Sequence, residues 1–581
     1  MHLMMDRAYR SAFILGYERM AAWSDVLDQI NIFPVPDADT GRNLKISLAA
    51  LQQMHEHPVG VSRQILKTAT GNAGNIATAF IHELLKINDA TTLADSIQAG
   101  MRAARKAVAD PKPGTMLTLF ETLAQAIPPG VTPASEWDIE MIIGKLEACV
   151  NDTTDMLPVL TPAGVVDAGA LGMFLFLEAF LLHLSGLTHL NRPVTDRFNG
   201  KLHIANDWQP RDLQPEHCLS AVIRPHADRS EGIRRLKGWG SCVVINETQD
   251  LLKVHLHTTD RDAALAGFAS IGQLLDYSDE KIEMALSNAD NASQPVHIMT
   301  DAAGSVTQED AKGLGMTLLD SYLIVDDQSY PETLYPHATL YSAMAQGRKV
   351  STAQASVYRR HQSYLSAVSR FERVLYLCVG SAYTGNFDIA RSWQAAHDDT
   401  GRLSIVDTGA ASGRLGIVAL ATAHHARRNE EPEAVLRFAK QAIGQSQELV
   451  FLDQLKYLAA GGRISKTRGF LGDLLHLKPV ISPLPQGAAK VGVVRTLEGQ
   501  LAFALKRLER CFHRCESPLI LLQYSDNKDW VEQVAAIELR SLLPEANILF
   551  RPLSLTSGAH MGPGAWALAF LPDAFNHEHH P

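Results

Sequence analysis

The sequence predicts a multidomain protein in which an all-α domain, a small α+β domain and an α/β domain follow one another. A chain of 581 residues is too long to fold around one hydrophobic core. Apolar residues recur at helical spacing over residues 1–195. The pattern becomes strand-like over 196–290, and strand-like and helical stretches alternate over 291–581.

The first domain is expected to be a helical bundle with its functional residues in the loops at one end. Segments with apolar residues three to four positions apart are 6–30, 41–57, 93–110 and 137–157. Glycine-bearing loops lie between the helical stretches, at 36–41, 69–75, 111–116 and 163–172. Residues 171–184 are strongly apolar, but they contain Glu178 and His183 and are too short to span a bilayer comfortably. A buried helix is expected there.

The middle domain contains residues 240–258, GSCVVINETQDLLKVHLHT, which alternate like two strands joined by a polar turn. The polar stretch SNADNASQP at 287–295 predicts a linker to the next domain.

The third domain begins a strand–helix alternation that predicts a largely parallel sheet. Its expected strands include 295–301, 373–380, 402–409 and 518–526. Three of them end in polar loops with glycine, at 300–305, 380–385 and 407–413. Ligands of open α/β sheets bind at the carboxyl ends of strands, so these loops are expected to share one crevice.

Composition excludes several classes of protein. A formal charge of −10 and the lack of a long basic run argue against nucleic acid as a main partner. The opening residues lack the apolar core of a signal peptide, and six cysteines in so long a chain do not form a disulfide framework. We therefore expect a cytoplasmic protein with peripheral or no membrane contact.

The stretch NIFPVPDADTG at 31–41 places Asp37 and Asp39 one residue apart, where their charges repel unless a cation lies between them. Mg²⁺ prefers carboxylate oxygens and is typically shared with substrate phosphates. The glycine loops nearby supply backbone N–H groups suited to phosphates. The alternative is a solvated turn in which Asp39 caps the following helix.

A second candidate site combines Cys218 with His255 and His257, which point to the same face if they lie on a strand. One thiolate and two imidazoles suit Zn²⁺, with water or another side chain in the fourth place. The alternative is a pair of surface histidines. The remaining cysteines are interpreted as packed thiols: Cys149, Cys242, Cys378, Cys511 and Cys515.

The motifs NIFPVPDADTGRNL, GNAGNIATAF, GTMLTLFETL and GVVDAGALGMFLFLEA, in this order, resemble the nucleotide-binding domain of bacterial fatty acid kinases. That domain is related to the ATP-binding subunit of dihydroxyacetone kinase. The resemblance implies an eight-helix barrel that holds ATP and two Mg²⁺ ions, with Asp37 and Asp39 as ligands. It places these residues around the nucleotide: Thr40, Asn43, Asn72, Gly114, Thr115 and Asp167. The sequence departs from the family pattern at Ala38, Arg42 and Ala73.

The middle domain of fatty acid kinases also carries a cysteine near its start and a VHVHT motif, like Cys218 and LKVHLHTTD here. The resemblance implies that this trio binds zinc. The zinc would be structural, or it would set the domain near the active site.

Seven motifs between residues 296 and 572, among them IMTDAAGSV, VSTAQASVY and LCVGSAYTGNF, resemble the DegV family of fatty-acid-binding proteins. The resemblance implies a two-lobed α/β domain in which Thr352 and Ser381 hold the fatty acid carboxylate, with Arg463 and His560 close by. Taken one at a time, such Ser and Thr residues are ordinary caps and turns. The sequence departs from the family pattern at Ala302, Ala353, Ala355 and Gly380.

Together the resemblances imply a fatty acid kinase that transfers phosphate from ATP to a bound fatty acid and forms an acyl phosphate. The residues expected to act in catalysis are Asp37, Asp39, Arg463 and His560, the last two by neutralising anions. Kinase and lipid carrier, separate proteins in these families, are then joined in one chain. A homodimer and a downstream acyltransferase are the expected partners. The alternatives are a triose-type kinase, a lipid-binding or regulatory protein with a degenerate kinase domain, and a carrier of another apolar acid.

Overall fold

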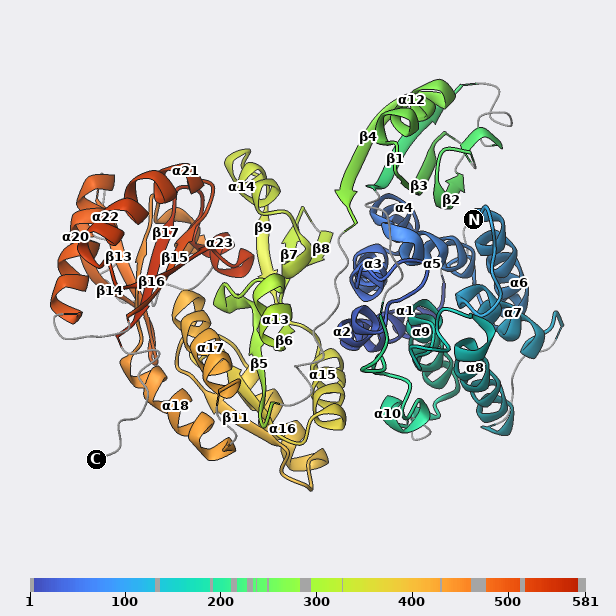
Figure 1. The fold of residues 1–581 in the computed structure, drawn as a ribbon, viewed down its shortest axis with the longest axis horizontal. Coiled ribbons are helices and arrows are strands. Elements are labelled where there is room, and N and C mark those ends of the chain that lie inside the picture. Colours follow the sequence, from blue (N-terminus) through green and yellow to red (C-terminus); the bar gives the residue numbers. More distant parts are fainter. Residues whose placement is uncertain are drawn as a thin grey trace. The chain divides into compact units, whose positions relative to one another are not determined.

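The structure, a computed structural model, describes residues 5–130, 136–188, 192–209, 217–226, 234–236, 238–247, 250–282, 294–326, 328–428, 431–460, 477–512 and 518–572. The chain divides into two compact units, Met1–Ala289 and Asp290–Pro581, each with hydrophobic cores of its own. Figure 1 follows the chain from the helical N-terminal region to the α/β elements of the second unit.

The N-terminal region is helical, as the sequence predicts. Its helices are α1 (Arg7–Ala22), α2 (Ser24–Gln29), α3 (Thr40–Leu48), the 3₁₀ helix η1 (Ala49–Gln53), α4 (Pro58–Thr68), α5 (Gly71–Leu84), α6 (Ala90–Ala107), α7 (Met116–Ala126), α8 (Glu136–Met156), α9 (Ala168–Ser185) and α10 (Val194–Arg197). The predicted segment 6–30 forms two helices, because the backbone leaves helical geometry at Trp23.

Helix α9 is the most buried element of this region, and it confirms the buried helix predicted around residues 171–184. It is long and apolar enough to cross a membrane by composition, but 83% of the helix is buried inside the protein. Its one carboxylate, Glu178, is fully buried and pairs with Arg19 and Arg197, each at 2.6 Å. Two guanidinium groups thus offset the cost of burying that charge.

The sheet of the N-terminal unit has four antiparallel strands in the order β2–β3–β1–β4: β1 (His217–Pro225), β2 (Ser241–Glu247), β3 (Leu252–Thr258) and β4 (Gly272–Lys281). The pairing of β2 with β3 confirms the predicted strand pair. Helix α12 (Arg261–Ile271) packs on one face of the sheet. The other face meets the helices, where the side-chain amide of Asn246 donates to the Asn75 carbonyl at 3.0 Å.

The described residues of the second unit form three sheets with helices around them. Its strands are β5 (His297–Asp301), β6 (Thr317–Leu319), β7 (Tyr322–Val325), β8 (Gln328–Pro331), β9 (Val350–Ala353), β10 (Val374–Cys378), β11 (Leu403–Asp407), β12 (Gln447–Phe451), β13 (Lys478–Leu484), β14 (Gly487–Val494), β15 (Leu519–Tyr524), β16 (Asn547–Pro552) and β17 (Trp566–Leu571). Its helices are α13 (Gln308–Leu314), α14 (His337–Ala345), α15 (Val357–Arg370), α16 (Asn386–His397), α17 (Ser412–Ala426), α18 (Pro432–Gln445), α19 (Lys456–Ala460), α20 (Leu497–Cys511), α21 (Lys528–Trp530), α22 (Ala536–Leu542) and α23 (Leu555–Met561), with short 3₁₀ or π segments η4 (Ala302–Gly304), η5 (Glu332–Leu334) and η6 (Val531–Ala535).

The prediction of a largely parallel sheet is correct for only one of these sheets. Strands β11–β10–β5–β6 pair in parallel. In the six-stranded sheet β14–β13–β12–β17–β15–β16, only β15 and β16 are parallel to each other. The apolar run at 518–526 predicted a buried strand correctly, but such a run does not encode the direction of its neighbours.

The loops after β5, β10 and β11 meet, as the sequence predicts for the ends of parallel strands. The backbone N–H of Val379 donates to the Asp301 carboxylate at 2.9 Å, and that of Gly380 donates to the Ala410 carbonyl at 2.8 Å. All three loops contribute to the lining of one cavity.

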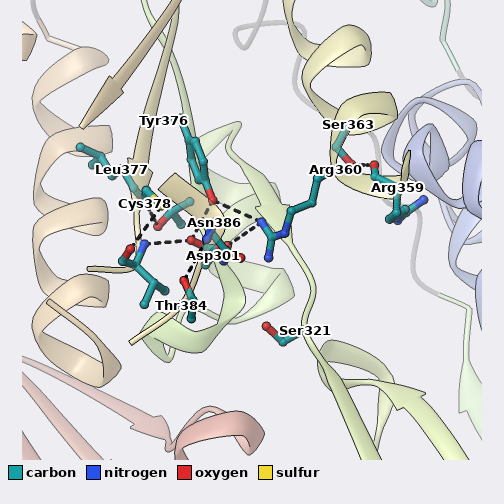
Figure 2. A network of polar contacts seen from close by, with 12 residues as sticks. Asp301, Ser321, Arg359, Arg360, Ser363, Tyr376, Leu377, Cys378, Thr384 and Asn386 are labelled. Carbon is teal, nitrogen blue, oxygen red and sulfur yellow. Dashed lines mark hydrogen bonds and ion pairs between the residues drawn. The ribbon is translucent and has the colours of Figure 1, made fainter. Parts of the chain in front are cut away.

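Asp301 is the centre of a buried polar network at the end of β5 (Figure 2). Its carboxylate accepts hydrogen bonds from Arg360 at 3.1 Å, Tyr376 at 2.9 Å and Asn386 at 3.0 Å, besides the backbone of Val379. The Asp301 and Arg360 side chains are 0% and 1% exposed. This ion pair therefore fixes the loop after β10 from inside the domain.

Candidate functional site

A cavity of about 470 Å³ opens in the N-terminal unit where the helices meet the four-stranded sheet. Its lining comes from the loop before α3, the start of α5, the loops before α7 and α9, and strands β2 and β3. The sequence-predicted residues that line it are Asp37, Asp39, Thr40, Asn43, Asn72, Thr115, Asp167, His255 and His257. Residues from the helical and the sheet-containing parts of the chain thus share one site.

Asp28, which sequence reasoning did not single out, caps α3. This helix follows the loop that contains Asp37 and Asp39, which we call the aspartate loop. The Asp28 carboxylate accepts the backbone N–H groups of Gly41 at 2.7 Å and Arg42 at 3.0 Å. A side chain at Gly41 would lie 1.9 Å from the carbonyl oxygen of Ser24, so only glycine allows this approach. Asp39 occupies the N-cap position of α3 without a side-chain capping bond. The alternative interpretation is thus correct for the position of Asp39, but its side chain does not cap the helix.

Asp37 and Asp39 form a pair of half-buried carboxylates that repel each other. Burial raises the pKa of both groups, and the charge of Asp39 raises the pKa of Asp37 further. The Asn31 amide donates to Asp37 at 2.5 Å and accepts from the Thr40 hydroxyl at 2.8 Å, which holds the loop in shape. A divalent cation with carboxylate preference fits this pair, because it would remove the repulsion that raises both pKa values.

Helix α5 begins at the cavity and presents its N-terminus there. Gly71 opens the helix with φ +62°, a left-handed conformation that favours glycine. The Asn72 side-chain oxygen is buried without a hydrogen-bond partner in the described residues. Unpaired backbone N–H groups at a helix N-terminus and a buried free amide are features that bind phosphate or a nucleobase.

The loops before α7 and α9 complete the helical wall. The Thr115 hydroxyl caps α7 by accepting the backbone N–H of Leu117, and the Asp167 carboxylate caps α9 by accepting that of Ala170 at 2.7 Å. Burial raises the pKa of Asp167 to about 7. Gly114 turns the chain with φ +79°, but it lies outside the described lining of the cavity.

Ala38 departs from the family glycine at a position where glycine is favoured, because its φ is +52°. A left-handed conformation costs a non-glycine residue about 1–2 kcal/mol. We expect Ala38→Gly to raise the free energy of unfolding by up to about 1 kcal/mol, since glycine also gains entropy in the unfolded chain. Urea denaturation of the full chain measures this. A loss of stability would contradict the interpretation of Ala38 as strained.

Arg42 and Ala73 are the other departures from the family pattern. The Arg42 side chain is exposed, and its charge acts to lower the pKa of Asp39. Ala73 lines the cavity next to Asn72. Nothing in the structure explains either substitution further.

The predicted zinc ligands Cys218, His255 and His257 are brought together, with donor atoms within 4.8 Å of one another. His255 and His257 are 1% and 3% exposed, so the alternative of surface histidines is wrong. Ser220 bonds Nδ1 of His255 at 3.0 Å, while Nε2 of His255 and Nδ1 of His257 are buried without partners in the described residues. Burial lowers the pKa of His257 to about 4 and the pKa of His255 well below its ordinary value. Neutral imidazoles with unpaired nitrogens beside a thiol fit a metal such as zinc.

Strand β2 adds cavity residues that sequence reasoning missed or interpreted otherwise. Ser241 pairs with His257 and Val244 with His255, so one extra residue forms a bulge between them. Cys242 lies in that bulge with φ +55° and lines the cavity, so it is more than a packed thiol. Cys149, Cys378 and Cys511 pack in or against hydrophobic cores as predicted, and Cys515 lies outside the described residues.

The second unit has a smaller, mainly apolar cavity of about 110 Å³. Its walls come from the loops after β5, β10 and β11, from β12, β13 and α19, and from α23. Apolar lining residues are Ala303, Val379, Ala411, Val450, Leu452, Leu458, Ile481, Pro483, Ala488 and Met561. Helix α23 contributes Thr556, Ser557 and His560. Sequence reasoning missed Thr556.

Of the four residues predicted to hold a carboxylate, the structure brings two into contact. The Thr352 hydroxyl and Nε2 of His560 are 3.2 Å apart. Ser381 is exposed and its backbone N–H donates to Asp407 at 3.1 Å, while Tyr383 and Thr384 of the same loop line the cavity. Arg463 lies outside the described residues.

Three family models match successive parts of the chain. The DAK2 domain matches residues 34–182, the FakA-like middle domain of fatty acid kinases matches 214–289, and the DegV family matches 295–573. The helical region, the small sheet and the α/β unit thus define a chain of three known domain types. The protein combines a DAK2 domain, a FakA-like middle domain and a DegV family domain in one chain.

Curated relatives match the chain over part of their own length. Protein YloV of Bacillus subtilis is 27% identical over 355 residues, which cover 54% of this chain and 64% of that protein. An uncharacterized protein of Staphylococcus haemolyticus, SH1689, is 28% identical over 282 residues, covering 43% of this chain and 50% of that protein.

Solved structures resemble the second unit. A DegV family protein from Thermus thermophilus, described as fatty acid binding, has 24% identity and a TM-score of 0.43, and the match covers 48% of this chain and 99% of that one. DegV of Bacillus subtilis, described as a fatty acid binding protein, has 16% identity and a TM-score of 0.44, with 48% and 98% covered.

Proposed function

We propose that this protein is a fatty acid kinase, which transfers the γ-phosphoryl group of ATP to the carboxylate of a fatty acid bound in the DegV domain. The observation that carries the proposal is the pair Asp37 and Asp39, which line a cavity of about 470 Å³. The Asp39 side chain makes no capping bond to α3. The DAK2 and fatty acid kinase-like domain matches support the phosphate donor side of the reaction, and the DegV match supports the acceptor side.

The nucleotide would bind in the large cavity. Asn72 and the N-terminus of α5 are suited to its polar groups, and the apolar Phe33, Ile76 and Met116 in the lining offer a surface for a base. Asp37 and Asp39 would hold Mg²⁺. When bound, Mg²⁺ offsets the charge of the triphosphate and of the two carboxylates.

The reaction needs little covalent work from the protein. A carboxylate oxygen of the fatty acid attacks the γ-phosphorus, and the bond from phosphorus to the β–γ bridging oxygen breaks, so that an acyl phosphate and ADP form. The carboxylate is already ionised at neutral pH, so no base has to remove a proton. The chain's own residues position the reactants and neutralise charge, and His560 and Arg463 would do this at the carboxylate.

The apolar cavity of the second unit would bind the acyl chain. The part of the cavity that the described residues line, about 110 Å³, is smaller than a long acyl chain. Thr352 and His560, 3.2 Å apart, would receive the carboxylate.

We expect Thr352→Val and His560→Asn each to weaken fatty acid binding by about tenfold or more, because each removes a hydrogen bond to a charged group worth about 1.5–3 kcal/mol. Titration with a fluorescent fatty acid measures this. Thr339→Val, on α14, serves as a matched Thr→Val control. Equal affinity in Thr352→Val and the control would contradict the assigned role of Thr352.

The experiment that tests the function combines two measurements on the full chain. Mass spectrometry of the ligand extracted from the purified protein identifies the bound acid, and trapping with hydroxylamine detects acyl phosphate after incubation with Mg²⁺ and ATP. Fatty acid in the extract with no trapped acyl group would favour a non-catalytic lipid-binding protein. Phosphorylation of dihydroxyacetone instead would favour the triose-type kinase.

A further inference from the structure

The metal-binding trio supplies only three donor atoms. Cys218, His255 and His257 lie within 4.8 Å of one another, and the described residues add no fourth Cys, His, Asp or Glu to this group. Structural zinc sites are almost always closed by four protein ligands, whereas sites that act on a substrate keep one position open. The trio therefore has the donor count of an open site.

The trio lies on the face of the sheet that meets the nucleotide cavity. In the register of β1 and β3, Cys218 is opposite His257 and Ser220 is opposite His255, so these side chains share one face. The other face packs against α12 through residues such as Leu256. His255 and His257 line the same cavity as Asp37 and Asp39.

The aspartate loop and the two histidines of the trio line one cavity. A nucleotide whose phosphates lie between the aspartate loop and the start of α5 would share this cavity with His255 and His257.

We propose that the metal held by Cys218, His255 and His257 has its fourth coordination position open to the cavity, and that a phosphate oxygen of the bound nucleotide occupies it. This inference rests on the proposed function, because it requires a nucleotide in the cavity. It assigns the middle domain a direct part in phosphate binding, rather than a purely structural one. Zinc accepts an oxygen ligand in this place, as it accepts water or substrate in other three-ligand sites.

Two side chains of this chain are the rivals for the fourth position. Cys242 lies in the β2 bulge next to His257 and lines the cavity. Glu280 is exposed on β4 directly opposite Cys218. Either would close the site and leave no place for phosphate.

Cobalt(II) in place of zinc gives visible bands that respond to a change of ligand, so the full chain loaded with Co²⁺ reports on the fourth position. We expect the bands to shift on addition of Mg²⁺ with a non-hydrolysable ATP analogue. The shift should saturate at the affinity that calorimetry measures for the same analogue. Adenosine, which has no phosphate, should leave the spectrum unchanged.

The variants Cys242→Ser and Glu280→Gln should leave the cobalt spectrum of the nucleotide-free protein unchanged, whereas Cys218→Ser should remove its thiolate band. X-ray absorption at the zinc edge of the unmodified protein checks this without any variant. It should count one sulfur at about 2.3 Å. Two sulfurs, or a loss of thiolate intensity in Cys242→Ser, would show that Cys242 closes the site and would overturn the inference.

The remaining outcomes separate this inference from the proposed function. If calorimetry shows that the analogue binds while the cobalt bands stay unchanged, the phosphate does not reach the metal. The inference is then wrong and the kinase proposal stands. If the analogue does not bind at all, both are wrong.

Discussion

Replacing Asp37 or Asp39 by Asn is expected to lower acyl phosphate formation by more than about 100-fold, while fatty acid binding stays unchanged. Loss of a partner outside a metal's own ligands already costs about 10–100-fold, and these two carboxylates are the proposed ligands themselves. The proposed acyl-chain cavity is in the other unit, which neither substitution touches. Hydroxylamine trapping and the fluorescent fatty acid titration measure the two properties separately.

In the metal-free protein, the same variants are expected to raise the free energy of unfolding, although they lower activity. Burial and mutual repulsion raise the pKa of both carboxyls above the ordinary 3.8, so the folded protein holds protons that the unfolded chain releases. The stability that these two carboxyls contribute in their protonated form is therefore fully present below pH 3.8. It is lost as the pH rises through their raised pKa values. We expect metal-free Asp37→Asn to be more stable than the wild type at about pH 8, with the difference shrinking toward about pH 4.

Binding of Mg²⁺ and nucleotide is expected to make the wild type more stable than Asp37→Asn. Mg²⁺ with nucleotide at about 100 times its Kd should stabilise the wild type by about 2.7 kcal/mol and raise the thermal midpoint of this unit by roughly 5–10 °C. Asp37→Asn should show no such rise. Asp155→Asn, an exposed carboxylate at the end of α8, is the matched control and should behave like the wild type. A full ligand-induced rise in Asp37→Asn would contradict the metal-binding role of the aspartate loop.

The sequence predicted the aspartate loop because its chemistry is local. Two carboxylates one residue apart, with prolines before and glycine after, already constrain where the charges lie. It did not predict Asp28, whose capping of Gly41 and Arg42 leaves Asp39 free for the cavity. Asp28 lies in a helical stretch with no motif around it, and only the fold brings it to the start of α3.

The sequence also did not predict that residues of the two candidate metal sites line one cavity. Cys218 and His257 can be grouped from residue type and strand periodicity. The cavity that His257 shares with Asp37, however, depends on how the sheet packs on α5 and α6. The hydrogen bond from Asn246 to Asn75 and the bridge between Val108 and Val244 hold that contact. Neither has a signal in the sequence, because each joins residues far apart in the chain.

In the second unit, the sequence predicted that three strand ends meet, since parallel strands place their carboxyl ends at one edge. It gave no role to Asp301, which appeared only as part of a TDAAG motif. The partner Arg360 lies on α15, and sequence reasoning gave it no role either. A buried ion pair cannot be predicted from the sequence, because only the fold shows that both charged groups are shielded from water.

Asp301→Ala is expected to be the most destabilising substitution in the second unit, costing about 3–5 kcal/mol of unfolding free energy. It would leave the Arg360 guanidinium buried without its counter-ion, and breaking a buried pair from one side is costly for that reason. It would also leave the hydroxyl of Tyr376, the amide of Asn386 and the backbone N–H of Val379 without their acceptor. Guanidinium denaturation, followed by the fluorescence of Trp393 and the other tryptophans of this unit, measures the loss.

The matched control is Asp326→Ala, which removes an ion pair with Arg348 whose partners are 46% and 40% exposed. Exposed pairs contribute about 0–1 kcal/mol, so this variant should differ little from the wild type. The double variant Asp301→Leu with Arg360→Met removes both charges and should regain much of the lost stability, because an apolar pair of similar size needs no counter-ion. Its fatty acid affinity should still fall, since Val379 would no longer be anchored and the loop that carries Ser381 would lose its position. Equal costs for Asp301→Ala and Asp326→Ala would show that the network contributes nothing beyond an ordinary surface pair.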